Sequence, residues 1–213
     1  MFNRAGAIAN GGIDADLQYI GATVDTANQT NYTFSGVNIG TPTANRVVVI
    51  GYSCNAGVSS VTIGGVAMIL VSGTVNAGLA YKKVASGTTA NIVISAVGSN
   101  TSCIIYRYTV QAVNEEHLDA FRAGGSPLAS LTAEDVETRP NGAVIAVSRF
   151  DDGEDYNDTW TGNDTFVRNY SALVETQRRT TLSAKTTEFS TDNDLTIERL
   201  SGTSNIQLAV ISF

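Results

Sequence analysis

Histidine, cysteine and charged residues are all scarce in this chain of 213 amino acids, and each scarcity argues against a class of function. His117 is the only histidine, and Cys54 and Cys103 are the only cysteines. One imidazole and two distant thiols do not supply the usual ligands of zinc or other transition metals. We therefore assign no metal and no cofactor, and we interpret His117 as a surface residue rather than a ligand.

Sequence motifs for nucleophilic or nucleotide chemistry are also missing. The chain contains no Gly-x-Ser-x-Gly elbow, no Cys–His signature, no phosphate-binding loop and no dinucleotide fingerprint. Strand-like residues flank Gly64-Gly65, without the helix that phosphate binding needs. We therefore predict no catalytic residues and a protein that is not an enzyme. A glycosidase, which needs only two carboxylates, is the alternative.

The balance of charge makes several partners unexpected. Charged residues are 15% of the chain, and 13 basic against 20 acidic residues give a net charge of −7. An acidic protein repels phosphate backbones, so we expect no nucleic-acid partner. The first ten residues lack the long apolar core of a secretory signal, and a bilayer-spanning run is also missing. We expect synthesis in the cytosol and no membrane partner.

The two cysteines lie in apolar, strand-like runs of the sequence. A small thiol buried in a core is the interpretation that we favour for each of them. A disulfide between Cys54 and Cys103 is the alternative.

Strand signals are what the chain has in abundance: short runs of Val, Ile, Thr and Tyr separated by Gly, Asn, Ser and Asp. The hydrophobic share of 43% is enough for a sizeable core. We predict an all-β fold, an antiparallel two-sheet sandwich of jelly-roll type. Predicted strands lie near 18–22, 32–37, 46–53, 60–63, 66–71, 79–84, 91–96, 102–110, 142–149, 158–161, 166–169, 180–188, 194–200 and 205–213.

Helical signals are few, and the main one lies at the centre of the chain. Leu118 and Phe121 share a face of a short predicted helix, Glu115–Arg122, which Gly124-Gly125 would end. Residues 111–141 are thus predicted to be a crossover between strand sets 18–110 and 142–213. The expected organisation is an N-terminal arm, 1–17, followed by a single sandwich domain, 18–213.

The two strand sets also show a weak internal repeat at an offset of roughly one hundred residues. The run Val49–Ser53 aligns with Ala146–Phe150, and Ile104–Val110 aligns with Gln207–Phe213. One interpretation is two related layers that cover each other's apolar side. The other is two generic sets of strands that match by chance.

Two features of the second half suggest ligands. Trp160 and Tyr156, with Phe166 and Tyr170 nearby, could stack on sugar rings, and the alternative is that they fill the core. We name Trp160 and Tyr156 as the candidate ligand-binding residues. The acidic stretch 151–158 is interpreted as a solvated loop, with a structural Ca²⁺ site as the alternative.

Several motifs in residues 18–110 carry a resemblance to a known group of proteins. They include Gln18–Ala22, Tyr32–Gly40, Val61–Ala67, Ala80–Val84 and Ile104–Arg107. The chain resembles β-sandwich virion proteins of tailed phages and prophages.

The resemblance implies a non-enzymatic component of a virion: a capsid decoration protein, a head fibre or part of a tail appendage. It carries over no functional residue. Implied partners are other capsid or tail subunits, in a homo-oligomer or a lattice-bound array, and the implied location is the virion, assembled in the host cytoplasm. The alternative is a carbohydrate- or receptor-binding module of a tail appendage that binds a host surface glycan.

Overall fold

The computed structural model describes residues 16–71, 75–111, 117–153, 155–162 and 164–213, and its regular elements are all β-strands. Their sheets are antiparallel, which confirms the predicted all-β class. The N-terminal arm lies outside the described residues except for Asp16 and Leu17. Among the described segments, none forms a helix with the length and apolarity needed to cross a membrane.

The first half of the chain forms one hydrogen-bonded sheet of eight strands that folds into two layers. The 18-residue strand β3 belongs to both layers, because its pairing with β8 ends at Cys54 and its pairing with β7 begins at Val58. One layer has the order β1-β8-β3-β6-β5, and the other joins β2, β7, β4 and the end of β3. The strands are β1 (Gln18–Asp25), β2 (Gln29–Asn38), β3 (Arg46–Ile63), β4 (Val66–Ala67), β5 (Ile69–Leu70), β6 (Val75–Lys83), β7 (Thr89–Asn100) and β8 (Cys103–Gln111).

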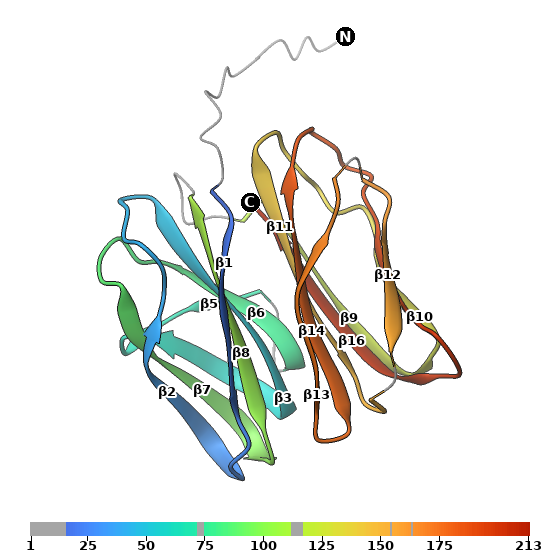
Figure 1. Ribbon diagram of the computed structural model, residues 1–213, viewed down its shortest axis with the longest axis horizontal. Coiled ribbons are helices and arrows are strands. Elements are labelled where there is room, and N and C mark those ends of the chain that lie inside the picture. Colours follow the sequence, from blue (N-terminus) through green and yellow to red (C-terminus); the bar gives the residue numbers. More distant parts are fainter. Residues whose placement is uncertain (1–15, 72–74, 112–116, 154, 163) are drawn as a thin grey trace, which may run out of the picture.

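The second half also forms two layers, here as two separate sheets. A five-stranded sheet has the order β13-β14-β11-β16-β9, and a three-stranded sheet has the order β10-β15-β12. The strands are β9 (Asp119–Leu128), β10 (Ser130–Ala133), β11 (Gly142–Phe150), β12 (Tyr156–Trp160), β13 (Val167–Val174), β14 (Gln177–Thr186), β15 (Leu195–Arg199) and β16 (Ser204–Ser212). Figure 1 shows the two halves side by side, blue to green and yellow to red.

The strands of the two halves pair in the same order. In the first half β8 pairs with β1 and β3, and β3 also pairs with β6. In the second half β16 pairs with β9 and β11, and β11 also pairs with β14. The pair β2·β7 likewise has its counterpart in β10·β15. The repeat predicted from the sequence is therefore real at the level of topology.

The alignment behind that repeat is correct for the last strand and shifted by one residue for an earlier one. Tyr106 and its aligned partner Ala209 both face the core between the halves, as expected. Val49 was aligned with Ala146, but its counterpart facing this core is Ile145. Because side chains alternate along a strand, a shift of one residue moves a side chain to the opposite face.

Three hydrophobic cores lie between the four layers. One lies within each half, and the central core, formed by Val49, Tyr106, Ile145 and Ile211 among others, joins the two halves. The strands that carry it, β3, β8, β11 and β16, are covered on both sides, which explains their nearly continuous apolar sequences. The stack thus has four layers instead of the two that were expected.

The predicted helix Glu115–Arg122 is wrong within the part of the chain that the structure describes. Residues 119–128 form the strand β9, which pairs with β16, and Glu115 and Glu116 lie outside the described residues. Gly124, interpreted as a helix stop, lies inside the strand, where an added Cβ would be 3.1 Å from the Ile206 carbonyl oxygen. Tertiary pairing has overridden a short helical pattern. The predicted crossover therefore contains β9 and β10, two strands of the second half.

The favoured interpretation of the cysteines, two free thiols, is also wrong. Cys54 of β3 and Cys103 of β8 are directly opposite each other in the sheet, and a disulfide joins them. Both side chains are fully buried in the core of the first half.

Candidate functional site

Trp160 and Tyr156, the residues predicted to bind a ligand, both lie on β12 with their side chains toward the outer core of the second half. Tyr156 is 3% exposed and stacks on Phe150 with ring centroids 4.8 Å apart. The guanidinium of Arg168 lies 4.7 Å from the centroid of the same ring. Burial raises the pKa of the Tyr156 hydroxyl. Tyr156 therefore presents little surface to a ligand.

Trp160 is only partly buried, and its indole packs edge-on against Phe166 with centroids 4.8 Å apart. Tyr170, the other aromatic residue predicted nearby, instead packs on Tyr106 beside the central core. The structure thus brings together two of the four aromatic side chains, and the candidate stacking surface is reduced to Trp160 and Phe166.

The acidic stretch 151–158 lies largely at the surface, as predicted, but its described aspartates are paired with arginines. Each of its four described aspartates forms an ion pair with an arginine: Asp151 with Arg149 at 2.6 Å, Asp152 with Arg199 at 2.8 Å, Asp155 with Arg178 at 3.3 Å and Asp158 with Arg168 at 2.5 Å. Carboxylates engaged by guanidinium groups are poor ligands for a cation. The calcium alternative therefore loses its ligands in this stretch.

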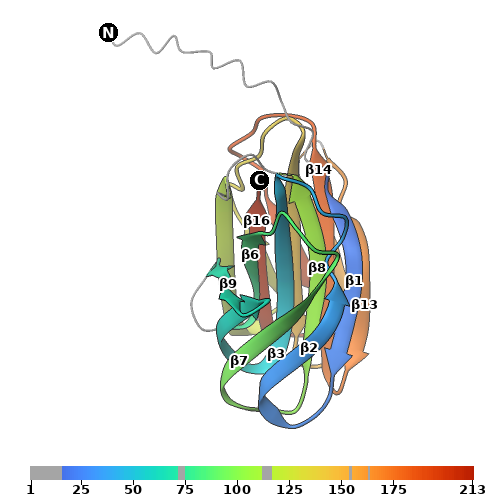
Figure 2. The ribbon, with the colours of Figure 1, turned by 90° about the vertical axis from the view of Figure 1, so that its left-hand side faces the viewer.

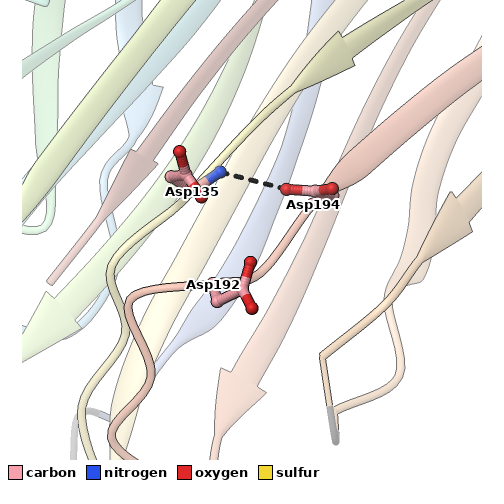
Figure 3. Close-up of side chains that lie close together, drawn as sticks. All are labelled: Asp135, Asp192 and Asp194. Atoms are coloured by element: carbon pink, nitrogen blue, oxygen red, sulfur yellow. Dashed lines mark hydrogen bonds between the residues drawn. The ribbon is translucent and has the colours of Figure 1, made fainter.

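Three other aspartates do lie close together, as Figure 3 shows. Asp135 follows β10, whereas Asp192 and Asp194 precede β15, and their carboxylate oxygens lie within 4.8 Å of one another. The backbone N–H of Asp135 donates a hydrogen bond to the Asp194 carboxylate at 3.0 Å. Such oxygens suit a hard cation such as Ca²⁺, but Asp135 and Asp192 are exposed. Exposed acidic groups are common without a bound ion, so we assign this group no metal.

The aspartates lie next to the end of β12. Thr161, which follows Trp160, accepts a hydrogen bond from the Asp194 N–H at 2.9 Å and donates its own N–H to the Asp194 carbonyl at 3.1 Å. Trp160 itself is opposite Leu195 in the β12·β15 pair. The three carboxylates thus lie near the end of the strand that carries Trp160, but the indole packs on the core side of the sheet together with Leu195.

Two buried arginines, which the sequence did not single out, hold the two halves together. Arg179 of β14 is fully buried and donates to the Ser53 carbonyl at 3.0 Å, to the Ser102 hydroxyl at 2.7 Å and to the Asn55 side chain. Arg149 of β11 donates to the Cys54 carbonyl at 3.1 Å. Burial lowers the pKa of Arg179 to about 10.

His117 lies beside β6, where its ring contacts Tyr81 and its Nδ1 is 3.0 Å from the tyrosine hydroxyl oxygen. The hydrogen bond and the ring contact both engage the imidazole.

In comparisons with known proteins, no family model matches the chain, and no curated protein or solved structure matches it. The structure itself defines the class as an all-β protein of antiparallel sheets.

Proposed function

We propose that this chain is a non-enzymatic structural component of a tailed-phage virion, most simply a capsid decoration protein or an accessory protein of the head or tail. The observation that carries the proposal is the strand order within each half. In the first half, β1-β8-β3-β6 faces β2, β7, the end of β3 and β4. This is the order of an eight-stranded jelly roll, an architecture that recurs in viral capsid proteins and lectins.

The second half supports the same proposal. Its five-stranded sheet contains the order β9-β16-β11-β14, with β13 added at the β14 edge, and faces β10-β15-β12. It therefore repeats the jelly-roll order with one strand fewer in the outer layer. The resemblance to virion proteins rested on residues 18–110, and the common strand order extends the argument to the rest of the chain. Two such units fused through a buried core form a rigid block, which suits a building element of a particle.

The proposed partners follow from repetition and charge. Particle lattices display repeated copies of each subunit, so we expect other capsid or tail proteins as partners and a symmetric oligomer or a lattice-bound array of this chain. A net charge of −7 disfavours the packaged nucleic acid as a partner. The proposed location is the assembled virion.

The arm hypothesis gives the first test of this function. Deleting Met1–Asp16 should abolish incorporation into particles, because residues 1–15 are rich in Ala, Gly and Asn and lack the periodicity of a core strand. Copies per particle, counted by quantitative mass spectrometry, should fall at least about tenfold. The melting temperature should hardly change, since the ion pair lost with Asp16 joins exposed groups.

The matched variant keeps the length of the arm but replaces residues 1–15 with a Gly/Ser segment. It should also fail to enter particles. Full occupancy of particles by the truncated protein would contradict the assembly role of the arm.

A carbohydrate- or receptor-binding module is the second candidate function, and the partly exposed indole of Trp160, packed against Phe166, favours it. An indole face stacks on sugar rings. If this function holds, Trp160→Ala should weaken binding to a glycan found by array screening by about tenfold or more.

Tyr156→Phe is the control for that experiment, because it retains the buried ring and removes only the hydroxyl. It should leave glycan binding unchanged. The binding function is excluded if the unmodified protein gives no array signal and Trp160→Ala only lowers the melting temperature.

A further inference from the structure

An open cleft of about 370 Å³ lies where the edges of the two central sheets meet. Figure 2 shows the edge strands β1 and β13 along the same flank of the molecule. Leu17 and Tyr19 form one wall, and β13 and β14 form the other with Val167, Asn169, Ser183 and Ala184.

The walls of the cleft are held in place, and part of their surface is apolar. The ring of Tyr19 packs on Tyr108 at 5.1 Å, and the Tyr108 hydroxyl donates to the Asn169 side-chain oxygen at 2.8 Å. Val167, however, is 59% exposed although it is a large aliphatic residue at the mouth of the cleft. A preformed site with an exposed valine is suited to receive another apolar side chain.

The cleft also offers unpaired backbone groups. Ala143 of β11 exchanges both of its backbone hydrogen bonds with Phe213, so Lys185, opposite Ala143 on β14, directs its N–H and C=O away from β11. On that other side β13 begins only at Val167, which is opposite Ser183. Among the described residues, Lys185 has no backbone partner there. The segment before β13 nevertheless passes this point, because Thr165 lines the cleft and the Asp164 carboxylate accepts hydrogen bonds from the Thr187 N–H and hydroxyl at 2.9 and 3.0 Å.

The other edges of the same two sheets are protected against strand addition. The edge strand β5 has only two residues. The edge strand β9 contains Pro127, which lacks a backbone donor, and a pair of glycines. The flank that carries β1 and β13 is therefore the open one.

The described chain begins at this cleft. Leu17 lines it, and the Asp16 carboxylate lies 3.9 Å from the Lys185 ammonium group. Fifteen residues precede Asp16, and a segment of that length can span up to about 50 Å when extended. They include Phe2, Ile8 and Ile13 among small residues, a composition that suits a small, partly apolar cleft.

We propose that the cleft binds residues 1–15 of a second copy of this chain. The proposal rests on the proposed assembly function and identifies the receptor of the arm. Insertion into the same chain's cleft would require the backbone to reverse just before Asp16, because Leu17 and Tyr19 already form one wall. A neighbour's segment enters without that reversal, as in other exchanged arms and added strands.

Photocrosslinking of the full chain tests this exchange. Ile8 is replaced by p-benzoylphenylalanine, and equal amounts of ¹⁴N- and ¹⁵N-labelled protein are mixed, irradiated and digested for mass spectrometry. We expect crosslinks that join a light residue 8 to a heavy peptide of segment 165–169 or 183–185, and the reverse. Val167→Lys, which places a charge at the mouth of the cleft, should reduce their yield by about tenfold.

The matched control is Val97→Lys, which changes a valine that is 65% exposed on the distant strand β7 and should leave the yield unchanged. Crosslinks confined to single-isotope pairs would overturn the proposal in favour of the chain's own segment. Crosslinks elsewhere, or none, would overturn the cleft as the receptor. If particle incorporation still depended on Met1–Asp16, the assembly function would survive that failure.

Discussion

Replacing Arg46 with methionine should lower the free energy of unfolding by about 3–5 kcal/mol. Arg46 is fully buried at the start of β3, and its guanidinium donates five hydrogen bonds to backbone carbonyl oxygens. The acceptors are Ile39, Gly40, Val84, Ser86 and Gly87, at 2.7 to 3.3 Å. A methionine fills much of the volume but leaves these carbonyls without a donor, so the loops on either side of β3 lose their common anchor.

Chemical denaturation monitored by circular dichroism measures this loss. Arg139→Met is the matched control, because Arg139 is exposed, and it should change stability by no more than about 0.5 kcal/mol. Arg46→Lys should fall between the two, since an ammonium group has fewer donors and cannot reach carbonyls on both sides. Equal stabilities for Arg46→Met and Arg139→Met would show that the carbonyl network does not hold these loops.

Replacing Gly51 with valine should destabilise the protein by about 3 kcal/mol, because Gly51 lies at a point of close approach between the two halves. A Cβ at this position would lie 2.6 Å from Cγ2 of Val147 on the opposite sheet and 3.1 Å from Cδ2 of Tyr106. The larger side chain therefore forces the two central sheets apart or displaces both neighbours from their rotamers. Thermal and chemical unfolding both report the effect.

Gly98→Val is the matched control, because an added Cβ at Gly98 on β7 meets no atom within 4 Å. It should leave stability within about 0.5 kcal/mol of the unmodified protein. A double-mutant cycle sharpens the test: Val147→Ala should offset part of the cost of Gly51→Ala, with a coupling of at least about 0.5 kcal/mol. Strict additivity would refute direct contact between the halves at Gly51.

Most strands could be predicted from the sequence because the central strands of the four layers are buried on both faces. Segments such as Arg46–Ser53 and Asn205–Phe213 lie in sheets covered on both faces, and burial on both faces leaves a long apolar run that is easily recognised. β9 was missed because it is an edge strand with glycines and a proline, whose short apolar spacing also fits one turn of helix. Local pattern alone cannot separate these two cases.

The candidate site was less accessible to prediction because its parts come from distant segments. Trp160 could be singled out as the only tryptophan, but Asp135 reaches Asp194 only through the pairing of β10 with β15. The same limit applies to the acidic stretch 151–158. Its neutralising partners include Arg178 and Arg199, which lie more than twenty residues further along the chain, so the local sequence does not predict these ion pairs. Composition identified the charges, whereas topology determined their partners.

The common pairing order of the two halves also bears on how the contact between them depends on protein concentration. Two like units joined through one buried core have the architecture of a dimer within a single polypeptide, and covalent linkage makes their contact independent of protein concentration. Dilution that would separate two free subunits leaves this contact intact. Substitutions on the surface of either outer layer therefore need not weaken the contact between the two halves. The two ends of one molecule can present different chemistry to different neighbours.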